Sequence, residues 1–176
     1  MSARDRILDT LESLLIADGE RGATLDAVAA QAGVSKGGLL YHFRNREAMV
    51  DGLLDRLLVL ADEDLDAMIK APEGPAAYYL RTSSNTAGPF DRLLTAVTRL
   101  GLEKHPRAGE TIRQIQDKWY EVLLTELKDP GIARAVMLIG DGLYYNALFA
   151  NEWPSDPDVI AQLSEVLTLL QRSARA

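Results

Sequence analysis

Apolar residues recur along most of the chain at the three- and four-residue spacing of amphipathic helices, and no stretch shows a convincing two-residue strand alternation. The first such segment covers about residues 3–18 and is followed by Gly19 and Gly22, which we expect to end it. Its apolar face consists of Ile7, Leu8, Leu11, Leu14 and Leu15. We predict that this stripe packs beneath the segments that follow.

Two short helices joined by a tight turn are predicted between residues 24 and 43. Thr24 can cap the first helix, Ser35 can cap the second, and Gly33 stands where the end of the first helix needs a positive φ. Helices joined by so short a turn must cross steeply, and the small side chain of Ala29 suits a close crossing. The spacing is that of a helix-turn-helix.

The remaining segments also read as helices. Asn45 is placed to cap a long helix that reaches about Lys70, after which the proline- and glycine-rich residues 71–75 interrupt the pattern. Further helices are predicted at about 76–81 and 90–103, then a long one that Pro106 precedes and residues 128–131 close, and then at about 132–151 and 158–172. We therefore predict an all-α chain with about nine helices.

Composition narrows the possibilities further. With 176 residues, 47% of them hydrophobic, the chain can bury one good core or a small head joined to a larger body. The absence of cysteine excludes disulfides and thiolate metal sites. The first residues do not resemble a secretion signal, and no apolar run approaches the roughly 20 residues of a membrane span, so we expect a cytoplasmic protein with no membrane contact.

The charge is unevenly distributed. The net charge is -7, which by itself argues against a nucleic-acid partner, yet residues 21–46 hold four basic residues against Asp26 and carry +3, leaving about -10 elsewhere. The most acidic segment holds Asp62, Glu63, Asp64 and Asp66. We interpret this segment as a solvated helix face in preference to a cation site, and the basic segment as a positive tip that attracts DNA.

Together these motifs resemble the TetR family of transcriptional regulators. The resemblance is carried by Thr24, by Ala-Gly-Val-Ser at 32–35, by Lys-Gly-Gly-Leu-Leu-Tyr-His-Phe at 36–43 and by Arg-Glu at 46–47, and it is close over about residues 3–55. It implies a homodimer in which the first three helices bind DNA, the fourth links, and the later helices enclose a ligand and dimerise. The implied domains are a DNA-binding domain, 1–46, and a ligand-binding and dimerisation domain, 47–176.

Spacing separates core from contact positions in the second short helix. Leu39 and Phe43 should face the first helix of the chain, whereas Lys36 is available for a guanine edge or a phosphate. Two adjacent glycines are costly in so short a helix, and we expect them to allow close approach to DNA. The predicted DNA contacts are Thr24, Ser35, Lys36, Gly37, Gly38, Leu40, Tyr41, His42 and Arg46. Leu40 and Arg46 depart from the tyrosine and lysine usual in the family.

Two further sets of residues are predicted in the larger domain. Aromatic and polar side chains predicted to bind a small organic effector are Met68, Phe90, Trp119, Asp141, Tyr144, Tyr145 and Asn146. Apolar positions predicted to form a twofold four-helix interface are Val136, Leu143, Ala147, Val159, Leu163, Val166, Leu167 and Leu170. The alternative in both cases is that these residues fill an ordinary core within one chain.

No catalytic, cofactor or metal motif is recognised. Ser83 and Ser84 lack a partnered histidine and acid, and His42 and His105 lack further ligands at helical spacing. We therefore predict a ligand-responsive regulator, acting as a repressor, which binds palindromic operator DNA as a homodimer and is released by its effector. The alternatives are a ligand-independent or architectural DNA-binding dimer and, further off, a helical enzyme with an incidental helix-turn-helix.

Overall fold

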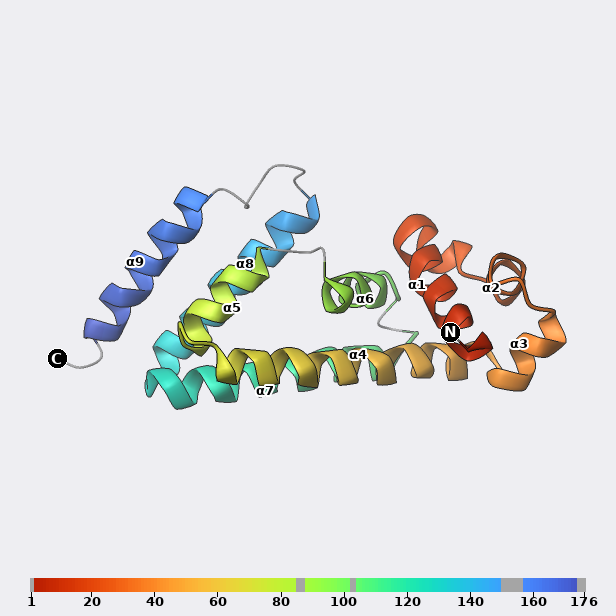
Figure 1. Cartoon of the computed structure of the whole chain (residues 1–176), viewed down its shortest axis with the longest axis horizontal. Coiled ribbons are helices and arrows are strands. Elements are labelled where there is room, and N and C mark those ends of the chain that lie inside the picture. The colour runs from red at the N-terminus through yellow and green to blue at the C-terminus, as the bar shows by residue number, and fades with distance from the viewer. Residues whose placement is uncertain (1, 85–87, 102–103, 150–156, 174–176) are drawn as a thin grey trace. The chain divides into compact units, whose positions relative to one another are not determined.

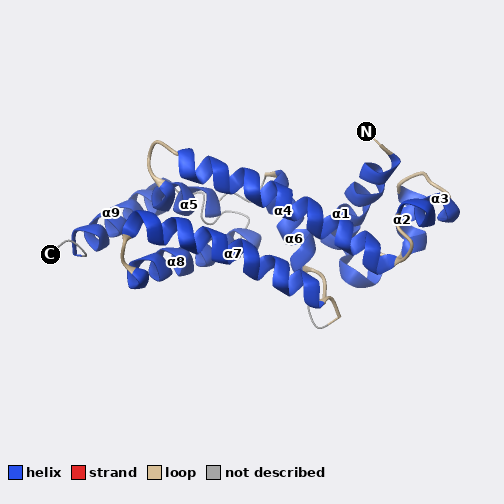
Figure 2. Cartoon of the chain, turned by 90° about the horizontal axis from the view of Figure 1, so that it is seen from below, coloured by secondary structure: helices blue, strands red, loops and turns tan. Residues whose placement is uncertain are grey.

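Every secondary-structure element in the described part of the chain is a helix, as Figures 1 and 2 show. The structure is a computed structural model that describes residues 2–84, 88–101, 104–149 and 157–173. The helices are α1 (Ala3–Gly22), α2 (Leu25–Gln31), α3 (Lys36–His42), α4 (Arg46–Lys70), α5 (Pro75–Ser83), α6 (Pro89–Thr98), α7 (Pro106–Leu127), α8 (Pro130–Phe149) and α9 (Pro157–Ser173). Within these residues the predicted all-α architecture is confirmed.

One predicted helix end is confirmed and another is wrong. The regular helix predicted to end near residue 18 breaks at Gly19, which adopts φ 67°, and the few helical residues after this kink end at Gly22, so both predicted glycines mark its end. The helix predicted to reach residue 103 ends at Thr98, where Arg99 and Leu100 form tight turns back to Ala96 and Val97. Leu100 is buried like the helical positions before it, so the apolar spacing continued past the end of the helix. The predicted end of α8 at residue 151 lies outside the described residues.

The chain divides into two compact units. The first comprises residues 1–61 and 89–113, and the second comprises 62–88 and 114–176, so α4 and α7 contribute to both. This division follows packing. The predicted functional division at residue 46 concerns DNA and ligand binding and stays a prediction.

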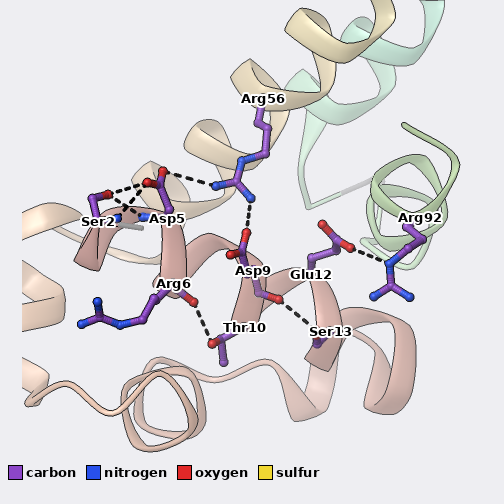
Figure 3. A network of polar contacts seen from close by, with 9 residues as sticks. All are labelled: Ser2, Asp5, Arg6, Asp9, Thr10, Glu12, Ser13, Arg56 and Arg92. Atoms are coloured by element: carbon purple, nitrogen blue, oxygen red, sulfur yellow. Dashed lines mark hydrogen bonds and ion pairs between the residues drawn. The ribbon is translucent and has the colours of Figure 1, made fainter. Parts of the chain in front are cut away.

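The first unit is organised around α1, which contacts α2, α3 and α6. The predicted stripe Ile7, Leu8, Leu11 and Leu15 is fully buried. Figure 3 shows how polar side chains on the same helix reach outward: Arg56 of α4 pairs with Asp5 and Asp9, and Arg92 of α6 pairs with Glu12. Burial raises the pKa of Glu12 although Arg92 opposes that shift. Apolar burial and charged pairs thus connect α1 to both α4 and α6.

In the second unit, α5 packs against both α8 and α9. Its start is fixed by α7: Glu126 accepts a hydrogen bond at 2.7 Å from the backbone N–H of Ala76 in the first turn of α5. Gly74 before it has φ 89°, and a Cβ there would lie 2.4 Å from Glu126. Gly140 of α8 allows another close contact, since a Cβ there would lie 2.3 Å from Cε1 of Tyr79.

Adding one methyl group at Gly140 tests the contact between α5 and α8. We expect Gly140→Ala to lower the free energy of unfolding by about 1–3 kcal/mol, because the Tyr79 ring cannot stay where it is. Gly109→Ala on α7 is the matched control, because a Cβ there meets nothing within 4 Å, and this helical replacement should stabilise by up to about 1 kcal/mol. Urea unfolding measures both, and equal effects would show that the Tyr79 contact carries no energy.

Candidate nucleic-acid interface and effector site

The helix-turn-helix is built from local hydrogen bonds. Thr24 Oγ1 accepts from the N–H of Ala27 at 3.1 Å, and Ser35 Oγ accepts from the N–H of Gly38 at 3.0 Å, so both predicted caps are present. Gly33 adopts φ 66° between the two helices, as predicted. Ala29 is buried and its carbonyl accepts from the N–H of Val34 at 3.0 Å. The caps and the turn therefore fix where α3 begins.

The two faces of α3 differ as the spacing predicted. Leu39 and the following Phe43 are buried, and the guanidinium carbon of Arg4 lies 5.2 Å from the centre of the Phe43 ring. Tyr41 is 86% exposed and Leu40 is 39% exposed. Lys36, Gly37 and His42 are exposed as well. Large side chains exposed on so short a helix indicate that its outer face meets something other than the rest of this chain.

The two glycines of α3 are not equivalent. A Cβ at Gly37 would approach no atom closer than Ser35 Oγ at 4.0 Å, whereas a Cβ at Gly38 would lie 3.2 Å from that oxygen. Gly38 is thus explained by the capping bond within the helix. At Gly37, by contrast, no described neighbour within the chain would crowd a side chain. The missing side chain at Gly37 therefore suits close approach to a partner.

Lys36 forms an ion pair that the sequence did not predict. Its Nζ lies 2.9 Å from Oδ1 of Asp26 in the first turn of α2, and both side chains remain largely exposed. The two residues are ten positions apart, a separation that no helical period connects. Only the turn between α2 and α3 brings them together.

Arg46 was predicted to contact a phosphate, but its guanidinium is engaged by other groups of the chain. Its guanidinium donates to the carbonyl oxygens of Ala23 at 3.5 Å and Glu20 at 3.4 Å, and lies 3.6 Å from the Glu20 carboxylate. Nη1 also lies 3.1 Å from Nε2 of His105, which is buried. The Glu20 carboxylate further accepts from the N–H of Gly101 at 3.1 Å. Arg46 therefore ties the start of α4 to α1 and to the segment after α6.

The second unit contains an aromatic cluster with two half-buried carboxylates. The rings of Tyr79 and Trp119 meet edge to face with centres 5.6 Å apart. Trp119 Nε1 donates to Asp64 at 3.2 Å, Tyr78 donates to the same carboxylate at 3.0 Å, and Tyr79 donates to Asp141 at 3.2 Å. We call these five residues, drawn from α4, α5, α7 and α8, the aromatic–acid cluster.

Burial governs the protonation of the aromatic–acid cluster. It raises the pKa of Asp64 and of Asp141, while the hydrogen bonds from the tyrosines and Trp119 oppose that shift. Burial and the neighbouring Asp141 carboxylate raise the pKa of Tyr79 above its usual value, so the phenol stays protonated as a donor. Among the described residues, neither carboxylate forms an ion pair with a lysine, arginine or histidine. The cluster therefore holds two carboxylates whose polar contacts come from tyrosine and tryptophan.

The acidic segment at 62–66 is only partly a solvated face. Asp62 pairs with Lys118 and Asp66 with Lys70 at exposed positions, as expected of solvated residues. The prediction is wrong for Asp64, which points into the aromatic–acid cluster. The signal was available, because Asp64 follows the buried Leu57 and Ala61 and precedes the buried Met68 at helical spacing.

Only some of the predicted effector residues lie in or near the aromatic–acid cluster. Met68 and Trp119 are buried, and Asp141 lies in the aromatic–acid cluster. Tyr79, which the sequence did not single out, packs against Trp119. Tyr145 and Asn146 are exposed, Tyr144 is half-buried, and Phe90 belongs to the first unit.

The residues predicted to form the dimer interface differ in how deeply they are buried within one chain. Val136, Leu143 and Leu167 are already buried within one chain, which leaves them little surface for a partner, and their assignment to the interface stays a prediction. Val159, Leu163 and Ala147 are half-buried, and the side chain of Leu170 lies outside the described residues. Among the side chains that the structure describes on α8 and α9, the large apolar ones that are exposed are Leu138, Tyr145, Val166 and Leu169. Because α8 is apolar on nearly all sides, its sequence could not decide which side faces inward.

The described residues offer neither a metal-binding cluster nor a membrane-spanning helix. No group of three or more histidine, cysteine or acidic side chains there is arranged to hold a metal ion. None of the described helices combines the length and the apolar character that crossing a membrane demands.

Two family profiles match consecutive parts of the chain. The family described as "Bacterial regulatory proteins, tetR family" matches residues 7–53, and the "Tetracyclin repressor-like, C-terminal domain" matches residues 73–172. The chain belongs to the TetR family. This TetR-family chain is thus a transcription regulator and not an enzyme, with a helix-turn-helix DNA-binding part and a ligand-binding C-terminal domain.

Solved structures share the TetR fold over nearly the whole chain. NalD, the secondary repressor of the MexAB-OprM multidrug efflux pump in Pseudomonas aeruginosa, has a TM-score of 0.73 at 19% identity, covering 94% of this chain and 93% of NalD. A TetR-family member from Streptomyces coelicolor A3 has a TM-score of 0.69 at 24% identity, covering 97% and 98%. The multidrug binding protein EbrR, complexed with malachite green, has a TM-score of 0.69 at 21% identity, covering 95% and 96%. Among curated proteins, none matches the chain.

Proposed function

We propose that this TetR-family regulator is a cytoplasmic repressor that binds palindromic operator DNA as a homodimer and is released by a small organic effector. The observation that carries the proposal is α3, a short capped helix with a buried inner face and with Lys36, Leu40 and Tyr41 on its outer face. Such a helix meets the shape requirements of the major groove.

We assign the DNA contacts in two groups. Lys36 reads a base edge, Gly37 lets the backbone approach closely, and Leu40 meets a thymine methyl group. The backbone phosphates are contacted from α2 and α3 by Thr24, Ser35, Tyr41 and His42. Gly38 and Arg46 are left out of this surface, because a capping bond occupies the space beside Gly38 and the guanidinium of Arg46 is engaged within the chain.

We assign the twofold interface to the outer faces of α8 and α9. Leu138 and Tyr145 are two turns apart on α8, and Val166 and Leu169 are one turn apart on α9, so each helix presents an exposed apolar stripe. Four such helices across a twofold axis bury these stripes, as in a four-helix bundle. A twofold dimer matches a palindrome whose half-sites lie about 34 Å apart.

We assign effector binding to the surroundings of the aromatic–acid cluster. Aromatic walls with a few directed polar groups suit a small organic molecule. Such a molecule releases the operator only if it binds the DNA-bound and DNA-free conformations with different affinity.

Trp119 offers a direct test of the effector assignment. The chain has two tryptophans, so Trp153→Phe leaves Trp119 as the single indole emitter. We expect amphipathic aromatic compounds, malachite green among them, to quench Trp119 with saturation, and Tyr79→Phe, which leaves Asp141 without its phenol donor, to weaken binding about fivefold to tenfold. Quenching that never saturates, for every compound tried, would contradict the assignment.

The DNA assignment is tested with duplexes selected by the protein from a random-sequence pool. We expect recovered sequences to share a palindrome and to bind at least about a thousandfold more tightly than scrambled versions. Affinity should fall steeply as salt rises, since phosphate contacts release counterions. Recovery of no common sequence, with equal weak binding to all duplexes, would refute a sequence-specific regulator.

A further inference from the structure

The ion pair between Asp26 and Lys36 joins the two helices of the helix-turn-helix. Nζ of Lys36 lies 2.9 Å from Oδ1 and 3.1 Å from Oδ2 of Asp26, so the ammonium is shared by both carboxylate oxygens. We propose that Asp26 is a specificity-determining residue, which holds the Lys36 ammonium against α2 so that it reads base edges and does not bind phosphates. This inference rests on the proposed function of α3 in DNA binding.

The negative charge of Asp26 compensates the positive charge of Lys36. Asp26 is the one acidic residue between positions 21 and 46, and it lies opposite the first basic group of α3. A lysine and a carboxylate in an ion pair carry no net charge together, so phosphates attract the pair weakly. An ammonium nevertheless has three N–H groups, and the side facing away from Asp26 keeps a donor for an acceptor such as guanine O6 or N7.

The ion pair with Asp26 also orients the Lys36 side chain. A lysine side chain is long and flexible, and a free ammonium reaches phosphates in many directions without regard to sequence. Pairing with Asp26 favours one region of the surface for the ammonium before DNA arrives. Its side chain is 73% exposed and that of Lys36 is 58% exposed, and ion pairs this exposed stabilise a fold little. The pair can therefore be altered with the fold intact.

The experiment compares Asp26→Asn with the wild type on the selected palindromic duplex and on its scrambled version. We expect binding to the scrambled duplex to tighten about fivefold to tenfold, because freed Lys36 gains a phosphate. The ratio of the two affinities should fall by roughly tenfold, and the salt dependence on scrambled DNA should steepen by about one phosphate contact. A merely structural pair would change neither the ratio nor the salt dependence.

Two controls separate this effect from a general change of charge. Glu47→Gln removes the same charge from the exposed first turn of α4 and should leave the affinity ratio unchanged. In a Lys36→Ala background, Asp26→Asn should also leave the ratio unchanged, because the ammonium it releases is gone. Asp26→Ser, a second variant with a short polar side chain, should reproduce the result of Asp26→Asn.

Three outcomes would overturn the inference. The first is an unchanged ratio in folded Asp26→Asn and Asp26→Ser, the second is the same fall in the ratio without Lys36, and the third is the same fall in Glu47→Gln. If the wild type selects no duplex, the proposed function fails and the inference falls with it. Selection by the wild type with an unchanged ratio in the Asp26 variants removes only the inference.

Discussion

Gly37→Leu is expected to abolish specific DNA binding while leaving the protein folded. The Cβ position at Gly37 is open in the free chain, and leucine is a better helix former than glycine by up to about 1 kcal/mol, so thermal stability should hold or rise. In the groove, the same side chain would hold α3 away from the bases and remove several contacts together. We expect a loss of about 3 kcal/mol or more, roughly a hundredfold or more in affinity for the selected duplex.

A matched leucine distinguishes this effect from a general disturbance. A Cβ at Gly109 of α7 also meets nothing within 4 Å, so Gly109→Leu should bind the selected duplex like the wild type. Gly38→Ala should instead act on the fold, because its methyl group would crowd the Ser35 oxygen that caps α3. Wild-type affinity in Gly37→Leu would mean that the outer face of α3 does not enter a groove.

Leu138→Asp combined with Leu169→Asp is expected to convert the proposed dimer into monomers. Each side chain is 64% exposed in the single chain, so the change should cost the fold little. At a twofold interface each aspartate occurs twice, and an uncompensated buried charge costs several kcal/mol, about 3–5 for each broken contact. Light scattering should report the monomer mass, and affinity for the palindrome should fall sharply because one half-site is lost.

Val59→Asp serves as the control for the interface. Val59 on α4 is 58% exposed and belongs to the first unit, so this variant introduces the same charge at an exposed apolar position that is part of neither α8 nor α9. This variant should remain dimeric. An unchanged dimer in the Leu138 and Leu169 double variant would place the interface elsewhere, whereas dissociation of Val59→Asp would bring α4 into it.

The parts of the fold that could be predicted from the sequence depend on residues that are close together along the chain. The two caps at Thr24 and Ser35 and the positive φ of Gly33 depend on neighbours within three or four residues, so their geometry follows from residue type. The burial of Leu39 beneath an exposed Tyr41 follows in the same way from helical spacing. These features lie within residues 7–53, which the family described as "Bacterial regulatory proteins, tetR family" matches.

Contacts between distant segments explain what the sequence could not predict. Arg46 meets His105 only after several helices have packed, Lys36 meets Asp26 only through the turn between α2 and α3, and no spacing rule indicates either pair. On α8, apolar residues surround the helix, so choosing Val136 over Leu138 for the interface had no basis in periodicity. Asp64 is different, because its spacing from Met68 did indicate an inward position, and the acidic residues around it obscured that signal.

The most direct test of the central claim is DNA cleavage by a reagent attached beside α3. The chain has no cysteine, so Gln31→Cys at the end of α2 gives one attachment point for an iron–EDTA group in each protomer. On the selected duplex we predict two clusters of strand cuts about one helical turn, roughly 34 Å, apart, and none when Gly37→Leu is added. A tightly bound complex with evenly scattered cuts, or with a single unpaired cluster, would contradict a twofold dimer that presents α3 to DNA.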